Sequence, residues 1–199
     1  MRHTNDTNWR RKTMSTAALR WDDLPHYTYE DYVQWEGRWE LIEGIPYAMT
    51  PAPKIKHQRL GTRITQYLGE LLKDCGKCEA LLPVDWQVTS DTVVQADVIV
   101  VCREYEDENI GEDKLEKVPA LIFEILSPAT SHKDRIVKYQ LYEEAGVKYY
   151  CIVDPTTNSA LVFVLQKEKY QQAGDFEKGK MIFHLGPCQI EFDFRKIFE

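Results

Sequence analysis

No stretch of the sequence is apolar for long enough to span a membrane, which takes about 20 consecutive residues. The basic residues near the N-terminus precede no apolar segment, so the pattern of a secretory signal is missing. We therefore expect a cytoplasmic protein with no membrane partner. The P-loop, zincin and nucleophile-elbow motifs are also absent, and nothing in the sequence supports those enzyme classes.

Basic residues are fewer than acidic residues. The chain has 25 Lys and Arg against 32 Asp and Glu, a formal net charge of −7. This balance argues against a broad basic face for non-specific nucleic-acid binding. It leaves room for a local basic cleft, and a cluster of catalytic acids would itself make the balance more negative.

Cysteine is scarce and its number is odd, with five residues scattered along the chain. That pattern favours reduced thiols over a disulfide framework. Cys75 and Cys78 are the one close pair and have metal-ligand or redox spacing, but no second pair and no nearby His completes a zinc site. Because Gly76 between them is a natural helix C-cap, we interpret the pair as structural.

At 199 residues the chain suits one domain with a substantial core. We expect residues 1–20 to form a disordered basic arm and residues 21–199 to form a single α/β domain. Apolar spacing predicts helices over 54–73 and, after a capping-box pattern at Ser131, over 132–145. Predicted strands cover 95–101, 120–126 and 148–153, with a hairpin over 38–49 and short antiparallel strands after residue 160 that extend the sheet.

Two acids interrupt the apolar strands 95–101 and 120–126. If these strands pair antiparallel with Cys102 opposite Pro119, the same register places Asp97 opposite Glu124. Facing carboxylates cannot both stay ionised cheaply, so one holds a proton, a basic side chain lies between them, or a divalent metal does. A salt bridge explains either acid alone, whereas the pair together favours a metal such as Mg²⁺, Mn²⁺ or Ca²⁺.

The first half of the predicted helix 54–73 is locally basic. Lys54, Lys56, His57 and Arg59 gather where the helix N-terminus would also favour a phosphate. A solvated helix face explains the same residues about as well.

Several short sequence motifs resemble those of a bacterial restriction-endonuclease family, long catalogued as a domain of unknown function. That family is placed in the PD-(D/E)XK nuclease superfamily. The resemblance covers roughly residues 27–172 and implies a restriction-endonuclease-like mixed β-sheet flanked by helices. The phrases that carry it lie at residues 40–44, 96–101, 124–130, 138–142 and 150–155.

The resemblance implies roles for particular residues. Asp97 and Glu124 match the two metal-binding acids, and Glu43 matches an upstream Glu that often joins them. The superfamily's Lys normally follows the second acid by two residues, where this chain has Leu126. The family phrase points instead to Lys138 on the next helix, one turn after Asp134, with which it could form an i,i+4 pair.

Together these features predict an endonuclease that uses Mg²⁺ or Mn²⁺ and acts on nucleic acid, with DNA as the expected partner. Asp97, Glu124 and Lys138 are the expected catalytic residues. Cutting both strands of a duplex would suit a homodimer. The alternative is a module that keeps the nuclease fold for interaction or nucleic-acid binding without turnover.

Overall fold

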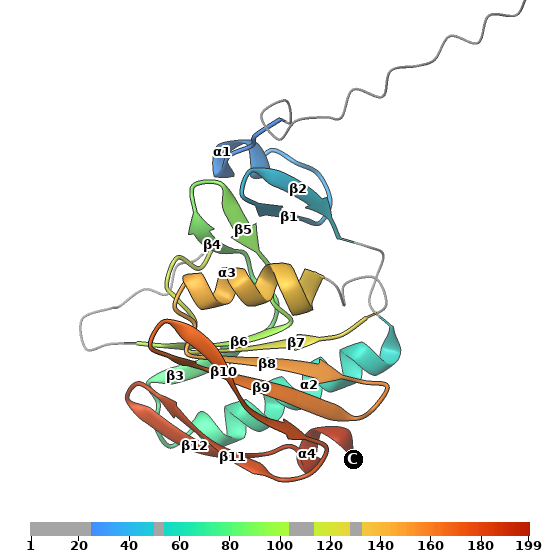
Figure 1. Cartoon of the computed structure of the whole chain (residues 1–199), viewed down its shortest axis with the longest axis vertical. Helices are drawn as coiled ribbons and strands as arrows, with labels where there is room; N and C mark the ends of the chain where they lie inside the picture. Colours follow the sequence, from blue (N-terminus) through green and yellow to red (C-terminus); the bar gives the residue numbers. More distant parts are fainter. Residues whose placement is uncertain (1–24, 50–53, 104–113, 128–132) are drawn as a thin grey trace, which may run out of the picture.

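The computed structural model describes residues 25–49, 54–103, 114–127 and 133–199. The arm expected over residues 1–20 and the cap expected at Ser131 lie outside these ranges. A mixed six-stranded sheet runs through the middle of the molecule (Figure 1). Its strands, in spatial order, are β10 (Lys169–Phe176), β9 (Ser159–Gln166), β8 (Tyr149–Asp154), β7 (Leu121–Ile125), β6 (Val98–Cys102) and β3 (Cys78–Leu81).

The central strands β6 and β7 pair antiparallel, with Val98 opposite Phe123. This is the predicted register, and one further step along it brings Asp97 opposite Glu124. Both strands are buried almost throughout, as expected for apolar strands that are covered on both faces. The two acids therefore stand at one end of a deeply buried strand pair.

Strands β7 and β8 are parallel, as predicted. The connection between them contains a π-helical turn, η2 (Lys133–Val137), followed by α3 (Lys138–Glu144), where the sequence predicted one continuous helix. The hydroxyl of Tyr150 donates to the carbonyl oxygen of Asp134 at 2.8 Å and so ties this turn to β8. The π-helical turn ends directly before Lys138, whose side chain is buried.

The two faces of the large sheet carry separate cores, because successive side chains of a strand point to opposite sides. Phe123 and Ile125 of β7 pack with the apolar stripe of α2 (Ile55–Leu72), a helix that matches the predicted one closely. Ile122 belongs to the other core, together with Tyr142 of α3. By this alternation Glu124 shares the face of Ile122 and lies toward α3.

A smaller four-stranded sheet lies beyond α3 in Figure 1, next to the short helix α1 (Tyr29–Tyr32). Glu43 and Gly44 form the turn of its predicted hairpin, and both have the positive φ, 50° and 73°, that a two-residue turn favours. Its strands, in spatial order, are β2 (Ile45–Ala48), β1 (Trp39–Ile42), β5 (Thr92–Val94) and β4 (Trp86–Thr89).

The chain ends in a separate hairpin, β11 (Lys180–Leu185) and β12 (Cys188–Asp193), followed by α4 (Arg195–Phe198). The prediction that these strands extend the main sheet is wrong, because within the described ranges they pair only with each other. Phe183 and Phe192 instead belong to the core that α2 covers. Side-chain packing therefore attaches this hairpin to the rest of the fold.

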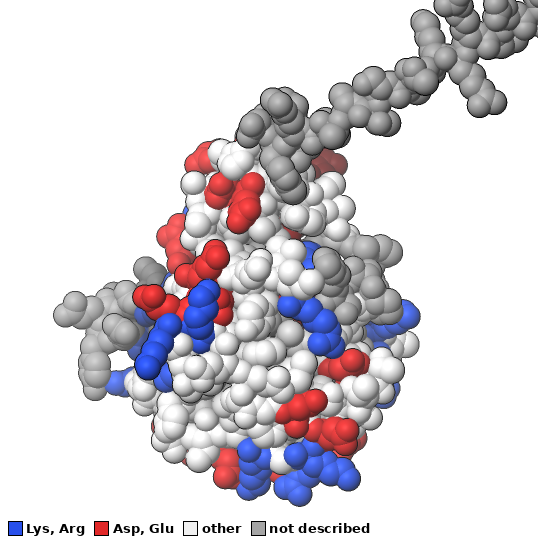
Figure 2. All heavy atoms as spheres, in the orientation of Figure 1, with Lys and Arg blue, Asp and Glu red and all other residues white. Residues whose placement is uncertain are grey.

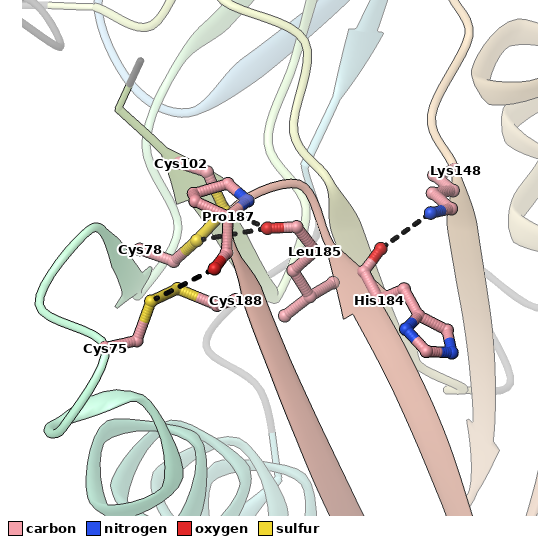
Figure 3. The surroundings of a disulfide bond; sticks show 8 residues. All are labelled: Cys75, Cys78, Cys102, Lys148, His184, Leu185, Pro187 and Cys188. Atoms are coloured by element: carbon pink, nitrogen blue, oxygen red, sulfur yellow. Dashed lines mark hydrogen bonds between the residues drawn. A yellow bond between two sulfur atoms is a disulfide. The ribbon is translucent and has the colours of Figure 1, made fainter. Parts of the chain in front are cut away.

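The expectation of reduced thiols is also wrong for this structure. Cys75 is bonded to Cys188, and Cys78 is bonded to Cys102 (Figure 3). The partners are 113 and 24 residues apart in sequence, so the fold rather than local spacing brings them together. Cys151 is free and buried.

Acidic and basic side chains are interspersed on the face shown in Figure 2, with no continuous basic surface there. This distribution agrees with the net charge of −7. Among the described residues, no helix combines the length and apolar character needed to cross a membrane.

Gly44 offers a test of the hairpin turn. Its φ is +73°, and a Cβ added there would lie 2.3 Å from Nδ1 of His26. We expect Gly44→Ala to lower the free energy of unfolding by about 1–2 kcal/mol or more, measured by urea denaturation. Gly69→Ala is the matched control, because it lies within α2 with open space around it. That change should instead stabilise by up to about 1 kcal/mol, and equal effects would contradict the strained turn.

Candidate active site

The two acids of the central strand pair differ in exposure. Asp97 directly precedes β6, and its Oδ2 accepts the backbone N–H of Ile125 at 2.7 Å. Nε2 of His57, from α2, lies 3.2 Å from the same oxygen. The Asp97 side chain keeps 23% of its surface exposed, against 4% for Glu124. Asp97 is therefore the member of the pair that solvent reaches.

Glu124 is covered by α3, and two donors from that helix share one of its oxygens. Its Oε1 accepts Nζ of Lys138 at 2.8 Å and the hydroxyl of Tyr142 at 2.7 Å. Residues four apart lie on one face of a helix, so α3 presents both donors together. The Lys singled out by the resemblance thus reaches the second acid, while the buried Leu126 stands two residues after it.

A third acid, Glu40 of β1, joins the cluster and is fully buried. Its Oε1 lies 2.8 Å from Nζ of Lys138 and accepts the N–H of Gln95 at 3.0 Å. Its Oε2 pairs with Lys133. The Lys138 ammonium therefore sits between two buried carboxylates, one from each sheet.

Glu43, predicted as a metal ligand, is not part of this cluster. It occupies the turn between β1 and β2, and it is exposed. Its backbone N–H donates to Oγ1 of Thr92 at 3.1 Å. Glu40, three residues earlier in the same hairpin, is the acid that β1 delivers to Lys138.

The start of α2 brings the predicted basic residues to the edge of the site. His57 contacts Asp97 directly, and Asp97 raises the pKa of His57 although burial acts in the opposite direction. Lys54, Lys56 and Arg59 are exposed. Lys56 also donates to the carbonyl oxygen of Pro155, just after β8. These three exposed side chains, the basic border, lie within one helical turn of His57.

Burial and the ion pairs act in opposite directions on the cluster. Burial alone would raise the pKa of Glu40, but Lys138 and Lys133 outweigh it and lower that pKa. Burial and neighbouring acids outweigh Lys138 at Glu124, whose pKa is raised well above its usual value. Burial opposes the Lys138 charge, yet Glu124 and Glu40 hold its pKa well above the usual range. The pKa values of the two carboxylates bound to Lys138 are thus shifted in opposite directions, which favours the protonated form at Glu124 and the ionised form at Glu40.

The arrangement does not form a ready-made metal site. Among the described residues, no three His, Cys, Asp or Glu side chains are already gathered around a position for an ion. Asp97 and Glu124 nevertheless supply the oxygen ligands that Mg²⁺ and Mn²⁺ take. Burial is the main cause of the raised pKa of Glu124 and repulsion by neighbouring acids adds to it, so a cation between Asp97 and Glu124 would favour the ionised form of Glu124.

The model of the Uma2 family, described as a putative restriction endonuclease, matches residues 29–189. The chain belongs to the Uma2 family. The matched span contains both sheets that form the acid cluster, together with α2 and α3. A comparison with curated proteins finds no match.

A solved structure supports the fold of this Uma2 chain. It is a putative nuclease of the DUF820 family from Anabaena variabilis, with a TM-score of 0.67 and 17% sequence identity. The similarity covers 86% of this chain and 97% of that one. The nuclease-like α/β fold expected from the sequence is therefore confirmed.

Two residues of the acid cluster, Glu40 and Tyr142, were not identified from the sequence. Glu40 interrupts the apolar run Trp39–Ile42, which is the same signal that singled out Asp97 and Glu124. Tyr142 follows Lys138 by one helical turn, a spacing that would have placed it beside the same acid.

Lys138 offers a test of the buried cluster. Lys138→Met would leave Glu40 and Glu124 buried without their shared cation, so we expect a loss of about 3–5 kcal/mol in unfolding free energy. The measurement is urea denaturation at pH 7 in the presence of EDTA. Lys178→Met, at an exposed position, should change stability by less than about 0.5 kcal/mol. A similarly small loss for Lys138→Met would contradict the ion-pair assignment.

A second test uses pH. Because the pKa of Glu124 is raised well above its usual value of 4.5, the folded metal-free protein binds a proton at this residue more tightly than the unfolded chain does. Its unfolding free energy should therefore fall as pH rises above that value, by up to about 1.4 kcal/mol per pH unit, until the raised pKa is passed. Glu124→Gln removes this proton site, so the difference in stability between variant and wild type should move in favour of the variant over the same interval. Denaturation curves at several pH values in EDTA measure it, and a change of opposite sign would indicate a lowered pKa.

Proposed function

We propose that this Uma2 chain is a metal-dependent endonuclease that hydrolyses phosphodiester bonds in nucleic acid, with DNA as the expected substrate and Mg²⁺ or Mn²⁺ as the cofactor. The observation that carries the proposal is the meeting of Asp97 and Glu124 on adjacent strands, with the buried Lys138 bound to Glu124. The family match supports the same class of activity.

The donor set fits a hard divalent cation. The hydrogen bonds described above use Oδ2 of Asp97 and Oε1 of Glu124, so we assign the other oxygen of each carboxylate to the metal. Glu40 is the third acid within the cluster and balances Lys138. When bound, the cation would supply Lewis acidity that makes a water more acidic and stabilises charge at the phosphate.

The surrounding residues hold the acids in place. The Ile125 N–H and His57 fix one oxygen of Asp97. Lys138 and Tyr142 fix one oxygen of Glu124, so neither carboxylate needs to reorganise much before a cation binds. The Lys138 ammonium is the cation bound to Glu124, and we assign it the role of orienting a water or stabilising charge near the reacting phosphorus.

We assign the basic border a contact with the phosphate backbone. Lys54, Lys56 and Arg59 are exposed at the start of α2, within one helical turn of His57, the residue that contacts Asp97. Since the chain is acidic overall, this local positive charge is what would draw a polyanion toward Asp97.

The central test combines metal binding with cleavage. Thermal melting with millimolar Mg²⁺ or Mn²⁺ should show a rise in Tm for the wild type that is lost in Asp97→Ala and Glu124→Ala, because each change removes a proposed ligand. A plasmid-nicking assay in the same buffers should show cleavage by the wild type. The rate of nicking should fall by about 100-fold or more in both variants.

The hairpin β1–β2 provides the matched control. Glu43→Gln changes an exposed turn residue and should keep both the Tm rise and the nicking. Glu40→Gln weakens the anchor of Lys138 and should reduce nicking. A rise in Tm without nicking on DNA or RNA would favour the non-catalytic binding module, and no rise would leave the acids with a structural role.

Salt dependence tests the basic border. Lys54→Glu combined with Arg59→Glu should weaken binding of duplex DNA uniformly across sequences and reduce the slope of log K against log salt by about 1–2. Lys178→Glu together with Lys180→Glu, exposed near β11, makes the same change in charge elsewhere. If both pairs weakened binding equally, net charge rather than the α2 border would be responsible.

A further inference from the structure

Four of the five cysteines gather at one place, at the opposite end of β6 from Asp97. They come from three segments: the turn that follows α2 and the start of β3 (Cys75 and Cys78), the end of β6 (Cys102), and the start of β12 (Cys188). All three segments meet at the tight turn between β11 and β12 (Figure 3).

Contacts to that turn place both sulfur pairs beside it. Sγ of Cys78 and Sγ of Cys102 lie 3.4 and 3.3 Å from one carbonyl oxygen, that of Leu185. Leu185 is paired directly with Cys188 across the hairpin. Sγ of Cys75 lies 3.8 Å from the carbonyl oxygen of Pro187. Both pairs therefore approach the same four-residue turn.

The backbone holds two of the three segments together without help from the sulfurs. Cys78 and Cys102 are direct partners on the β3–β6 ladder, with Cα atoms 4.0 Å apart. The N–H of Arg103 donates to the carbonyl oxygen of Lys77 at 2.8 Å. Gly76 has a φ of +64°, which lets the chain turn sharply between the first two cysteines.

The third segment is held by packing. Phe183, Leu185 and Phe192 of the C-terminal hairpin belong to the core that α2 covers, and Lys148 donates to the carbonyl oxygen of His184 at 2.7 Å. These contacts do not involve the sulfurs, so we expect the three segments to stay close when the disulfides are reduced.

We propose that, when both disulfides are reduced, Cys75, Cys78, Cys102 and Cys188 form a structural Zn²⁺ site. Four thiolates, two of them in a Cys-x₂-Cys turn, are the ligand set of closed tetrahedral zinc sites. Zinc holds its sulfur ligands about 3.8 Å apart, so each bonded pair must open by about 2 Å, the scale of a side-chain rotation.

Each disulfide takes up two electrons and two protons from a dithiol reductant, which is itself oxidised to a disulfide. The four thiols then lose their protons as Zn²⁺ binds. While the sulfurs are bonded in pairs they are not available as ligands, and the described residues accordingly contain no assembled metal group. Zinc binding and disulfide formation are thus alternative ways to fasten the C-terminal hairpin.

The site is independent of the proposed nuclease activity. Its position explains what it would do: β11 and β12 have no ladder to the main sheet within the described ranges, and Cys188 is the covalent attachment of this hairpin to the end of α2. A metal bound there would replace that attachment under reducing conditions.

The test uses the full chain, purified with a non-chelating phosphine reductant, which is oxidised to its oxide as the disulfides are reduced. Elemental analysis should find about one zinc per chain. Replacing zinc by Co²⁺ in the folded wild type should give the visible bands and the thiolate charge-transfer bands of a tetrahedral four-sulfur site. Oxidation should release the zinc and leave one titratable thiol in the unfolded protein, that of Cys151.

Variants sharpen the test. Cys75→Ser and Cys188→Ser should lower zinc affinity at least tenfold, whereas Cys151→Ser should keep one zinc per chain, because that thiol belongs to no pair. A reduced, folded wild type that retains no zinc after incubation with a stoichiometric amount would overturn the proposal. Cobalt spectra without thiolate bands would also overturn it. Either result would leave disulfide formation as the role of these four cysteines.

Discussion

The buried ammonium of Lys138 is the interaction on which the arrangement of the candidate site depends. It joins Glu40 of the small sheet to Glu124 of the large one, at 2.8 Å from each. A buried charge is costly unless it is paired, so each of the three side chains restricts where the other two can lie. The relation between the two sheets is therefore set partly by electrostatics and partly by packing.

The fold supplies what this triad requires. The β6–β7 register brings Asp97 to the level of Glu124, and the parallel β7–β8 connection returns α3 over the same face. The π-helical turn before α3 is tied to β8 through Tyr150, and it ends where Lys138 begins the helix. Local backbone irregularity thus serves to place one cation.

Much of this could be predicted from the sequence, because the decisive signals were local. Apolar runs predicted the central strands, and the acids within them marked Asp97 and Glu124. The register that makes these acids face each other was one assumed pairing, which the structure bears out. Glu43 was predicted as a metal ligand because its place in the chain matches that of the family's upstream Glu. In the structure it lies in an exposed turn and is not part of the cluster. The apolar run Trp39–Ile42, which Glu40 interrupts, marks the inward-pointing acid of this hairpin, whereas order along the chain does not. The disulfides escaped prediction for a related reason, since their partners are up to 113 residues apart.

The position of the lysine has a consequence for how the site can work. In a Glu-x-Lys motif the cation and the acid share one strand, so their separation is fixed by the pleat. Here Lys138 comes from a helix, and its contact with Glu124 depends on how α3 packs on the sheet. The same helix carries Tyr142, whose hydroxyl binds the same oxygen. Any shift of α3 would move both donors together and change the charge balance at Glu124. Packing of α3, rather than strand geometry, therefore controls whether the two acids are ready for a cation.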